Sequence, residues 1–313
     1  MPSVTRAEIR AAAGRVAPHI RVTPVLDLGP GGLGSDWHPV LKLEYLQHSG
    51  SFKARGAFNS LLSRPVGPAG VTAISGGNHG AAVALAAAKL GHRARVFVPQ
   101  SAPEAKRALI RRYGGEVVVA PDFNAALARC EDYIAETGAL KVHPFAEPAT
   151  IAGQGTLALE WQGQCDLDTV VIAVGGGGLI AGIALWYQDQ GVRVIGVEPE
   201  GSCALHAALA SGRAVDVVIN SVAADSLGAP NVGQLVFDLC AARVVRVVLV
   251  ADSAILAAQR ALWQECRIAT EPGGATAFAA VLSGAYQPQP GERVGILICG
   301  ANQDLAKLAA VTL

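Results

Sequence analysis

The feature that most constrains this chain is a repeated alternation of short apolar strands and longer helices, separated by glycine-rich turns. In the first half we predict strands at 71–74, 95–98 and 116–119, followed by helices at 79–90, 103–113 and 123–137. In the second half we predict strands at 169–174, 192–197, 244–250 and 296–298, with helices at 179–187 and from 253 onward. Strands that are apolar throughout are typical of parallel sheets covered by helices. We therefore predict an α/β protein with two open parallel-sheet lobes and a site between them, where the strands end.

The composition excludes several classes of function. Lys plus Arg and Asp plus Glu both number 25, so the net charge is zero and nothing favours nucleic acid or an anionic membrane as a partner. No apolar run is long enough to predict a membrane span, and the first residues lack the apolar core of a secretory signal. The cysteines, at positions 130, 165, 203, 240, 266 and 299, have no metal-ligand or redox spacing. We expect a cytoplasmic protein whose neutral charge allows it to form a homodimer.

A lysine with apolar neighbours lies in the segment Ser49-Gly50-Ser51-Phe52-Lys53-Ala54. A lysine held near apolar surface loses the solvation of its ammonium group, so its pKa falls and the neutral amine can form an imine. The alternative is a lysine at the start of a helix with no chemical role. The local sequence by itself favours that alternative, because strongly perturbed lysines are a minority.

Four consecutive glycines, Gly175 to Gly178, follow a predicted strand and precede a helix. Consecutive backbone N–H groups without side chains, added to a helix N-terminus, form a cradle for an anion. A flexible turn is the alternative, although four glycines are entropically unfavourable for a turn alone. Neither a P-loop nor the spaced dinucleotide fingerprint matches, so we predict a site for a single phosphate.

Three further turns also lead from a strand or loop into a helix. Ser75 to His79 offers small side chains and an Asn amide, which suit a carboxylate, although a helix capped by Ser or Asn explains it equally well. Glu271, before Pro272, can also be explained as an ordinary carboxylate in the first turn of a helix. Cys299 can also be explained as a buried structural thiol. None of the three identifies a function alone.

Taken in order, these segments resemble the pyridoxal-phosphate enzymes of the tryptophan-synthase-β fold, also called fold type II. The most similar subgroup is the serine/threonine dehydratases (ammonia-lyases), with the related serine racemases. The resemblance spans residues 9–308 and is carried by residues 51–57, 75–79, 175–178, 196–200, 271–272 and 299–302. Phe52 and Arg55-Gly56-Ala57 favour the dehydratase branch over the cysteine synthases, whose lysine has a different context.

The resemblance implies the cofactor pyridoxal 5'-phosphate and a set of residues that bind it. Lys53 would carry the cofactor as a Schiff base and act as the catalytic residue. The other implied cofactor-binding residues are Phe52 beside the ring, Asn78 at the ring hydroxyl, Gly175, Gly176, Gly177 and Gly178 at the phosphate, Glu271, and Cys299 facing the pyridine nitrogen. By the same resemblance, residues 1–69 and 147–313 would form a large cofactor-binding domain, and residues 70–146 a small domain.

The implied substrate is a small amino acid whose carboxylate would bind the loop of Ser75, Gly76, Asn78 and His79. Racemases of this group carry a serine at the position of Gly76, where it reprotonates the second face of the substrate. Because glycine has no side chain, racemisation is disfavoured here.

Two further departures concern regulation. Metal-activated relatives have an Asp six residues after a Glu-Pro glutamate, but Ala204 stands six residues after Glu198. Glu198 is thus only a weak candidate for a metal ligand, and we predict no metal site. The C-terminal effector-binding domain of biosynthetic threonine dehydratases is also expected to be absent, because the sequence ends at Leu313.

The resemblance therefore implies a lyase that converts L-threonine or L-serine to a 2-oxo acid and ammonia. An amino-acid racemase or a β-replacement synthase on the same fold is the alternative among enzymes. The alternative outside enzymes is a catalytically silent protein that binds the cofactor.

Overall fold

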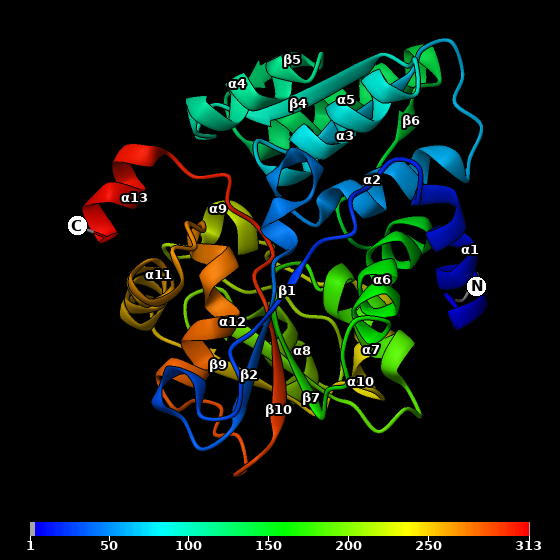
Figure 1. The fold of residues 1–313 in the computed structure, drawn as a ribbon. Coiled ribbons are helices and arrows are strands. Elements are labelled where there is room, and N and C mark those ends of the chain that lie inside the picture. Colours follow the sequence, from blue (N-terminus) through cyan, green and yellow to red (C-terminus); the bar gives the residue numbers. More distant parts are fainter. Residues whose placement is uncertain (1–3, 313) are drawn as a thin grey trace.

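The computed structural model describes residues 4–312, and in this range two β-sheets divide the chain into two lobes (Figure 1). The sheet of the large lobe has the strand order β1-β2-β10-β7-β8-β9. Its strands are β1 (Val25–Asp27), β2 (His38–Lys42), β10 (Arg293–Leu297), β7 (Thr169–Ala173), β8 (Arg193–Pro199) and β9 (Arg246–Val250). All neighbours are parallel except β1 and β2, which are antiparallel.

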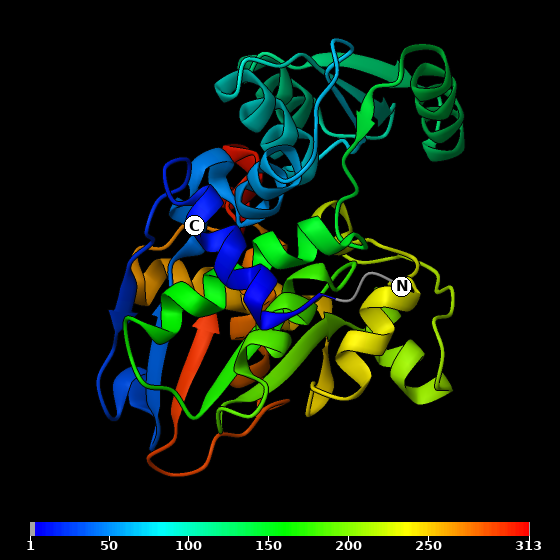
Figure 2. The same ribbon diagram turned by 90° about the vertical axis from the view of Figure 1, so that its right-hand side faces the viewer.

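The small lobe is built on a second sheet whose strands are all parallel, in the order β5-β4-β3-β6. These strands are β5 (Glu116–Ala120), β4 (Ala94–Pro99), β3 (Val71–Ile74) and β6 (Leu140–Lys141). Figure 2 shows this lobe above the larger one, connected to it by the chain before β3 and after β6. The carboxyl ends of parallel strands share one edge of a sheet, so both sheets can contribute loops to a common site.

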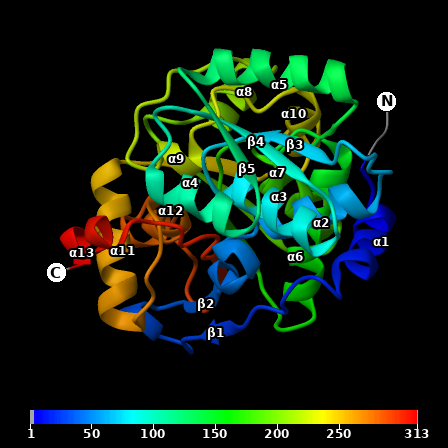
Figure 3. The same ribbon diagram turned by 90° about the horizontal axis from the view of Figure 1, so that it is seen from above.

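Helices cover both sheets. The small lobe contains α3 (Asn78–Lys89), α4 (Glu104–Arg112) and α5 (Phe123–Thr137). The other helices are α1 (Arg6–Val16), α2 (Lys53–Leu62), α6 (Pro148–Gln162), α7 (Gly178–Tyr187), α8 (Ala204–Ser211), α9 (Ala224–Leu227), α10 (Gln234–Ala241), α11 (Asp252–Cys266), α12 (Pro272–Leu282) and α13 (Leu305–Thr312), with short 3-10 turns at Gly32–Gly34, Glu44–Leu46 and His48–Gly50. Figure 3 shows α1 and α13, near the two ends of the chain, on opposite sides of the molecule.

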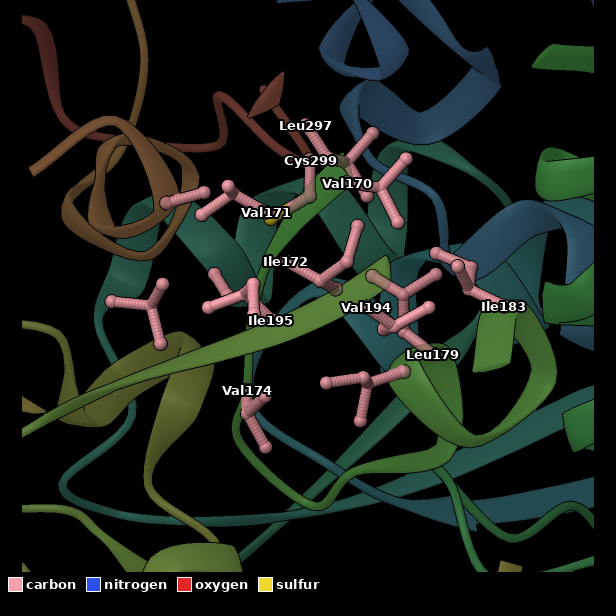
Figure 4. Close-up of a cluster of buried hydrophobic side chains, with 14 of the residues drawn as sticks. Val170, Val171, Ile172, Val174, Leu179, Ile183, Val194, Ile195, Leu297 and Cys299 are labelled. Carbon is pink, nitrogen blue, oxygen red and sulfur yellow. The ribbon is translucent and has the colours of Figure 1, made fainter. Parts of the chain in front are cut away.

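The core of the large lobe forms around β7 (Figure 4). Val170, Val171 and Ile172 are fully buried, because helices cover both faces of this central strand. Burying an aliphatic side chain of this size contributes about 1.5–3 kcal/mol relative to leaving it exposed. Cys299 follows β10 and is buried in the same cluster.

A buried network of charges holds helix α2 in place. The guanidinium of Arg55 donates to Glu44 at 2.6 Å and to Glu160 at 2.8 Å. Lys42 on β2 also donates to Glu160, at 2.6 Å. Because buried charges are stable only when paired, this network fixes the start of α2 against β2 and α6. The start of α2 is where Lys53 lies.

The predicted strands and their following helices are confirmed, including a helix at 123–137. Four helices were not predicted: α6, α8, α9 and α10. Helix α6 is buried on nearly every side, so its sequence lacks the amphipathic period that reveals a surface helix. The antiparallel edge strand β1 was also missed, since three residues are too few to show alternation. The domain boundaries at residues 70 and 146 stay a prediction.

No helix within residues 4–312 combines the length and the apolar character needed to cross a membrane.

Candidate active site

A cavity of about 550 Å³ lies between the two lobes, where the strands of the small sheet end. Its small-lobe wall is formed by the last residues of β3, β4 and β6, by residues that follow β3 and β6, and by the start of α5. The opposite wall is formed by Gly176 and by α9 with the loop after it. Lys53 reaches the cavity from the start of α2.

The amine of Lys53 is placed for chemistry rather than for solvation. Its Nζ donates a hydrogen bond of 2.7 Å to the backbone carbonyl of Pro144 and lies 5.0 Å from the ring centroid of Phe52. Burial lowers the pKa of Lys53 to about 8, because the ammonium loses water and gains no carboxylate partner. An amine with this pKa is partly neutral near pH 7, as a nucleophile or a general base must be.

The glycine loop connects β7 to α7. Within the described residues, the backbone N–H groups of Gly175, Gly176 and Gly177 donate no hydrogen bond inside the protein. Gly177 adopts a φ of +76°, in the left-handed region that favours glycine. These unpaired donors at the start of α7 are available to an anion, and the predicted phosphate contact stays a prediction.

Side chains at the positions of these glycines would close the cradle. A Cβ on Gly175 would lie 2.8 Å from Leu227, and a Cβ on Gly176 would overlap the ring of Phe145. A smaller cavity of about 20 Å³, lined by the loop, Phe52 and Lys53, adjoins the main cavity at Gly176. The loop, the lysine and Phe52 therefore fit a phosphorylated cofactor bound through an amine.

Asn78, the first residue of α3, lines the main cavity. Its Nδ2 donates to Oε1 of Glu271 at 2.5 Å, and its Oδ1 accepts from Asn302 at 2.8 Å. Glu271 is buried and also accepts from Lys106 at 3.3 Å. The Asn78 side chain is thus held from both ends.

Cys299 and Glu271 line neither of these two cavities, as far as the described residues form them. The thiol of Cys299 donates to the carbonyl of Gly273 at 3.6 Å. Burial, with a contribution from Glu271, raises the pKa of Cys299 to about 12, so the thiol is neutral. The predicted contact of Cys299 with a pyridine nitrogen stays a prediction.

The loop from Ser75 to His79 forms one side of the main cavity. The ring of His79 hydrogen-bonds through Nε2 to the carbonyl of Val142 at 2.8 Å. Burial lowers the pKa of His79 to about 3, so the ring is neutral and Nε2 donates this bond. Gly76 packs so closely that a Cβ there would overlap the Cβ of Ala102.

Glu198 lies at the end of β8, away from the residues that line the cavity. Its two carboxyl oxygens accept from the backbone N–H groups of Leu205 at 2.9 Å and His206 at 2.7 Å, at the start of α8. Among residues 4–312, no group of three or more His, Cys, Asp or Glu side chains is placed to hold a metal ion. Glu198 thus acts as a cap of α8 in this structure.

Several residues at the site were not identified from the sequence. Phe145 lines both cavities, and Asp225 lines the main one and pairs with Lys106 at 2.9 Å. The sequence signal for Phe145 was weak: an aromatic residue between a short strand and the Pro148 start of α6. Lys106 and Asp225 are ordinary surface residue types, and only the packing of the two lobes shows that Lys106 is buried.

Comparisons with known proteins agree with this geometry. Residues 16–300 match the family model described as pyridoxal-phosphate dependent enzyme. The chain is 41% identical to phenylserine dehydratase of Ralstonia pickettii, covering 99% of this chain and 97% of that protein. It is 37% identical to the catabolic L-threonine dehydratase of Escherichia coli K12, covering 87% of this chain and 85% of that protein. The structure of maize serine racemase superimposes with a TM-score of 0.92 at 32% sequence identity, covering 99% of this chain and 97% of that one. The chain therefore belongs to the pyridoxal-phosphate-dependent enzymes of fold type II.

Proposed function

We propose that this protein is an ammonia-lyase that converts a β-hydroxy amino acid, such as L-threonine or L-serine, to a 2-oxo acid and ammonia. In the net reaction the α-hydrogen and the β-hydroxyl leave, water adds to the resulting imine, and ammonia is released. The observation that carries the proposal is the arrangement of Lys53, the glycine loop and the Ser75–His79 loop around two adjoining cavities. The similarity to dehydratases of phenylserine and L-threonine supports it.

The residues that would hold the cofactor are those at the base of the cavity. Lys53 would join its ε-amino group to the aldehyde carbon, with loss of water. Gly175 to Gly178 would bind the phosphate through their free N–H groups, and Asn78 would donate to the ring hydroxyl. Phe52 would flank the ring. Bound pyridoxal phosphate supplies an electron sink that stabilises negative charge at the substrate α-carbon.

Lys53 is also the base that this arrangement supports best. With its ε-amine free, Lys53 would take the α-proton at Nζ, because its lowered pKa leaves a neutral fraction near pH 7. The hydrogen bond to the Pro144 carbonyl orients the amine. The backbone N–H groups of the Ser75–His79 loop, at the start of α3, would bind the substrate carboxylate.

The same reaction on a substrate with an aromatic β-substituent is a second candidate, and it is favoured by the shape of the cavity. Ile74, Pro99, Phe123, Leu127 and Pro230 form an apolar part of its wall. Phe123 is 58% exposed, so much of its ring is available for contact. Serine and threonine have no group large enough to cover this surface, whereas the phenyl ring of phenylserine does.

Racemisation is the weaker alternative, although serine racemases are among the similar proteins. Gly76 supplies no hydroxyl for the second face of the substrate, and Ala102 fills the space of a side chain there. The preference for elimination therefore rests on a contact between two small residues.

The test is an assay of 2-oxo acid release from L-serine, L-threonine and phenylserine by the holoenzyme. We expect 2-oxo acid release from at least one of these substrates and none with the Lys53→Ala variant.

For the aromatic class, Leu127→Ala should lower kcat/KM for phenylserine by about 10-fold or more and leave kcat/KM for L-serine nearly unchanged, because an apolar contact discriminates by about 10–200-fold. Leu282→Ala is the control, since Leu282 is a 49% exposed leucine that does not line the cavity. D-serine formation faster than pyruvate formation would overturn the lyase assignment.

A further inference from the structure

We propose that Lys106 is a positioning residue: its ammonium group holds the carboxylate of Glu271, and that carboxylate orients the amide of Asn78 toward the cofactor. The inference rests on the proposed function, because it concerns the same cofactor site. It adds a residue outside the cavity wall that acts through another side chain.

Lys106 connects the two lobes. It lies on α4 of the small lobe, is only 5% exposed, and contacts Glu271 and Asp225 of the large lobe. The distances from Nζ are 3.3 Å to Oε2 of Glu271 and 2.9 Å to Oδ2 of Asp225. Burial by itself would lower the pKa of Lys106, but the two carboxylates raise it above the ordinary value, so the ammonium persists.

Glu271 needs that ammonium more than Asp225 does. Its side chain is almost fully buried, whereas the side chain of Asp225 is 37% exposed and reaches solvent. Burial raises the pKa of Glu271, and the nearby Asp225 adds to this, while Lys106 and the Asn78 amide oppose it. Without Lys106, only the Asn78 amide would oppose the effects of burial and of Asp225, so the charged form of Glu271 would be disfavoured further.

The carboxylate of Glu271 and the amide of Asn302 together determine which way the Asn78 amide faces. A carboxylate only accepts hydrogen bonds, so it must face the NH₂ group of Asn78, as it does at 2.5 Å. At the other end, Asn302 donates to Oδ1 of Asn78 at 2.8 Å. The NH₂ of Asn302 is itself fixed, because it also donates to the carbonyl of Ser49 at 2.6 Å. One N–H of Asn78 is used by Glu271, and the other is the donor available to a bound group.

A protonated Glu271 would donate as well as accept, so Asn302 alone would then hold this orientation. Lys106 thus influences the cofactor site without touching it. A purely structural role for Lys106 would stabilise the contact between the lobes, but it would not depend on whether Glu271 carries a charge.

The experiment is a double-mutant cycle read out by the dissociation constant of pyridoxal 5'-phosphate from the reconstituted full-length protein. The variants are Lys106→Met, Lys106→Arg, Glu271→Gln and the double variant Lys106→Met/Glu271→Gln. The exposed Lys89 of the same lobe supplies the matched control, Lys89→Met. The near-ultraviolet and visible absorbance of the bound cofactor is a second readout, since it responds to hydrogen bonding at the ring hydroxyl.

We expect Lys106→Met to raise the dissociation constant by about 10-fold or more, as loss of a hydrogen bond to a charged group does. Lys106→Arg should restore most of the affinity, and Lys89→Met should match the wild type. In the Glu271→Gln background, Lys106→Met should change the constant by less than about 2-fold, because the glutamine side chain carries no charge to stabilise. The absorbance spectrum should change with Lys106→Met only when Glu271 is present.

The inference would be overturned if Lys106→Met changed the dissociation constant equally in the wild-type and Glu271→Gln backgrounds. It would also be overturned if Lys106→Met alone left the dissociation constant unchanged. If Lys106→Met alone does not fold, Glu271→Gln is compared with the double variant, which leaves no buried carboxylate unpaired at position 271. Unequal dissociation constants of the cofactor for these two variants would also overturn the inference. A wild-type protein that binds no cofactor overturns the proposed function together with this inference, whereas the other contradicting outcomes leave the proposed function intact.

Discussion

Lys53 is the residue on which the proposed chemistry depends. Its partners are a carbonyl and an aromatic ring, so nothing replaces the charge stabilisation that water gives an exposed ammonium. Burial lowers the pKa of Lys53 to about 8. At pH 7 a lysine with this pKa is about 10% neutral, compared with about 0.03% for an ordinary lysine of pKa near 10.5.

This lowered pKa predicts the pH dependence of labelling in the apoprotein. The acetylation rate of Lys53 by acetic anhydride should rise about 10-fold per pH unit below 8 and level off above it, because only the neutral amine reacts. Peptide mass spectrometry measures the rate, and the exposed Lys89 in the same sample provides the comparison. A Lys53 rate that is still rising steeply at pH 10 would show that the lysine is solvated.

A second residue-scale question is why Gly76 carries no side chain. Its backbone lies outside the left-handed region, so glycine is not required there for its φ. The constraint is steric, because a Cβ would overlap that of Ala102. Gly76 and Ala102 therefore form a pair whose combined volume is limited.

We predict that Gly76→Ser alone is destabilised by about 1–3 kcal/mol from overpacking. The double variant Gly76→Ser/Ala102→Gly should recover most of this loss, as measured by thermal unfolding. Chiral chromatography of L-serine reactions should then show more D-serine relative to pyruvate than the wild type gives. If Gly76→Ser is as stable as the wild type by itself, Ala102 does not limit this position.

Among the elements, the loop between β7 and α7 was predictable because four consecutive glycines between an apolar strand and a helix are a local sequence pattern. Gly177→Ala should lose stability and cofactor affinity, since a left-handed residue with a Cβ is strained by about 1–2 kcal/mol and the Cβ would also lie 2.5 Å from Val236. Gly191→Ala is the matched control, because Gly191 has the same φ of +76° and no atom within 4 Å of its Cβ position. Equal losses of unfolding temperature, with cofactor affinity retained in both, would remove the loop from the site.

The surroundings of Glu198 at the start of α8 lead to a prediction about metal ions. Glu198 caps this helix with both oxygens, and burial raises the pKa of Glu198 to about 8, against the opposing effect of the two backbone donors. At neutral pH it is therefore largely protonated, which is unfavourable for a divalent cation. We predict that chelation followed by magnesium or manganese changes the rate of 2-oxo acid release by less than about 2-fold. A large loss on chelation that magnesium restores would show that other residues bind a metal.

The sequence was informative where a local pattern carries the structure. Apolar strands and glycine turns are local, and the structure contains both of them. Contacts between distant segments were beyond such reasoning. The pairing of Lys106 with Glu271 joins residues 165 positions apart, and the apolar wall at Phe123 forms only when α5 packs near the loop after α9.

For the whole molecule, the two lobes account for how one site combines the different groups. The large lobe contributes the glycine loop, Lys53 reaches the site from the start of α2, and the small lobe contributes Asn78 and most of the apolar wall. Lys106 and Asn78 connect the lobes through Glu271. The homodimer and the cytoplasmic location expected from the sequence stay predictions.

The most direct test of the account is to identify the lysine that carries the cofactor. The purified protein, reconstituted with pyridoxal 5'-phosphate, is reduced with borohydride, digested and examined by peptide mass spectrometry. The account predicts a pyridoxyl group on Lys53, and no stable attachment or 2-oxo acid release in Lys53→Ala. A pyridoxyl group on another lysine, with full activity retained in Lys53→Ala, would contradict it.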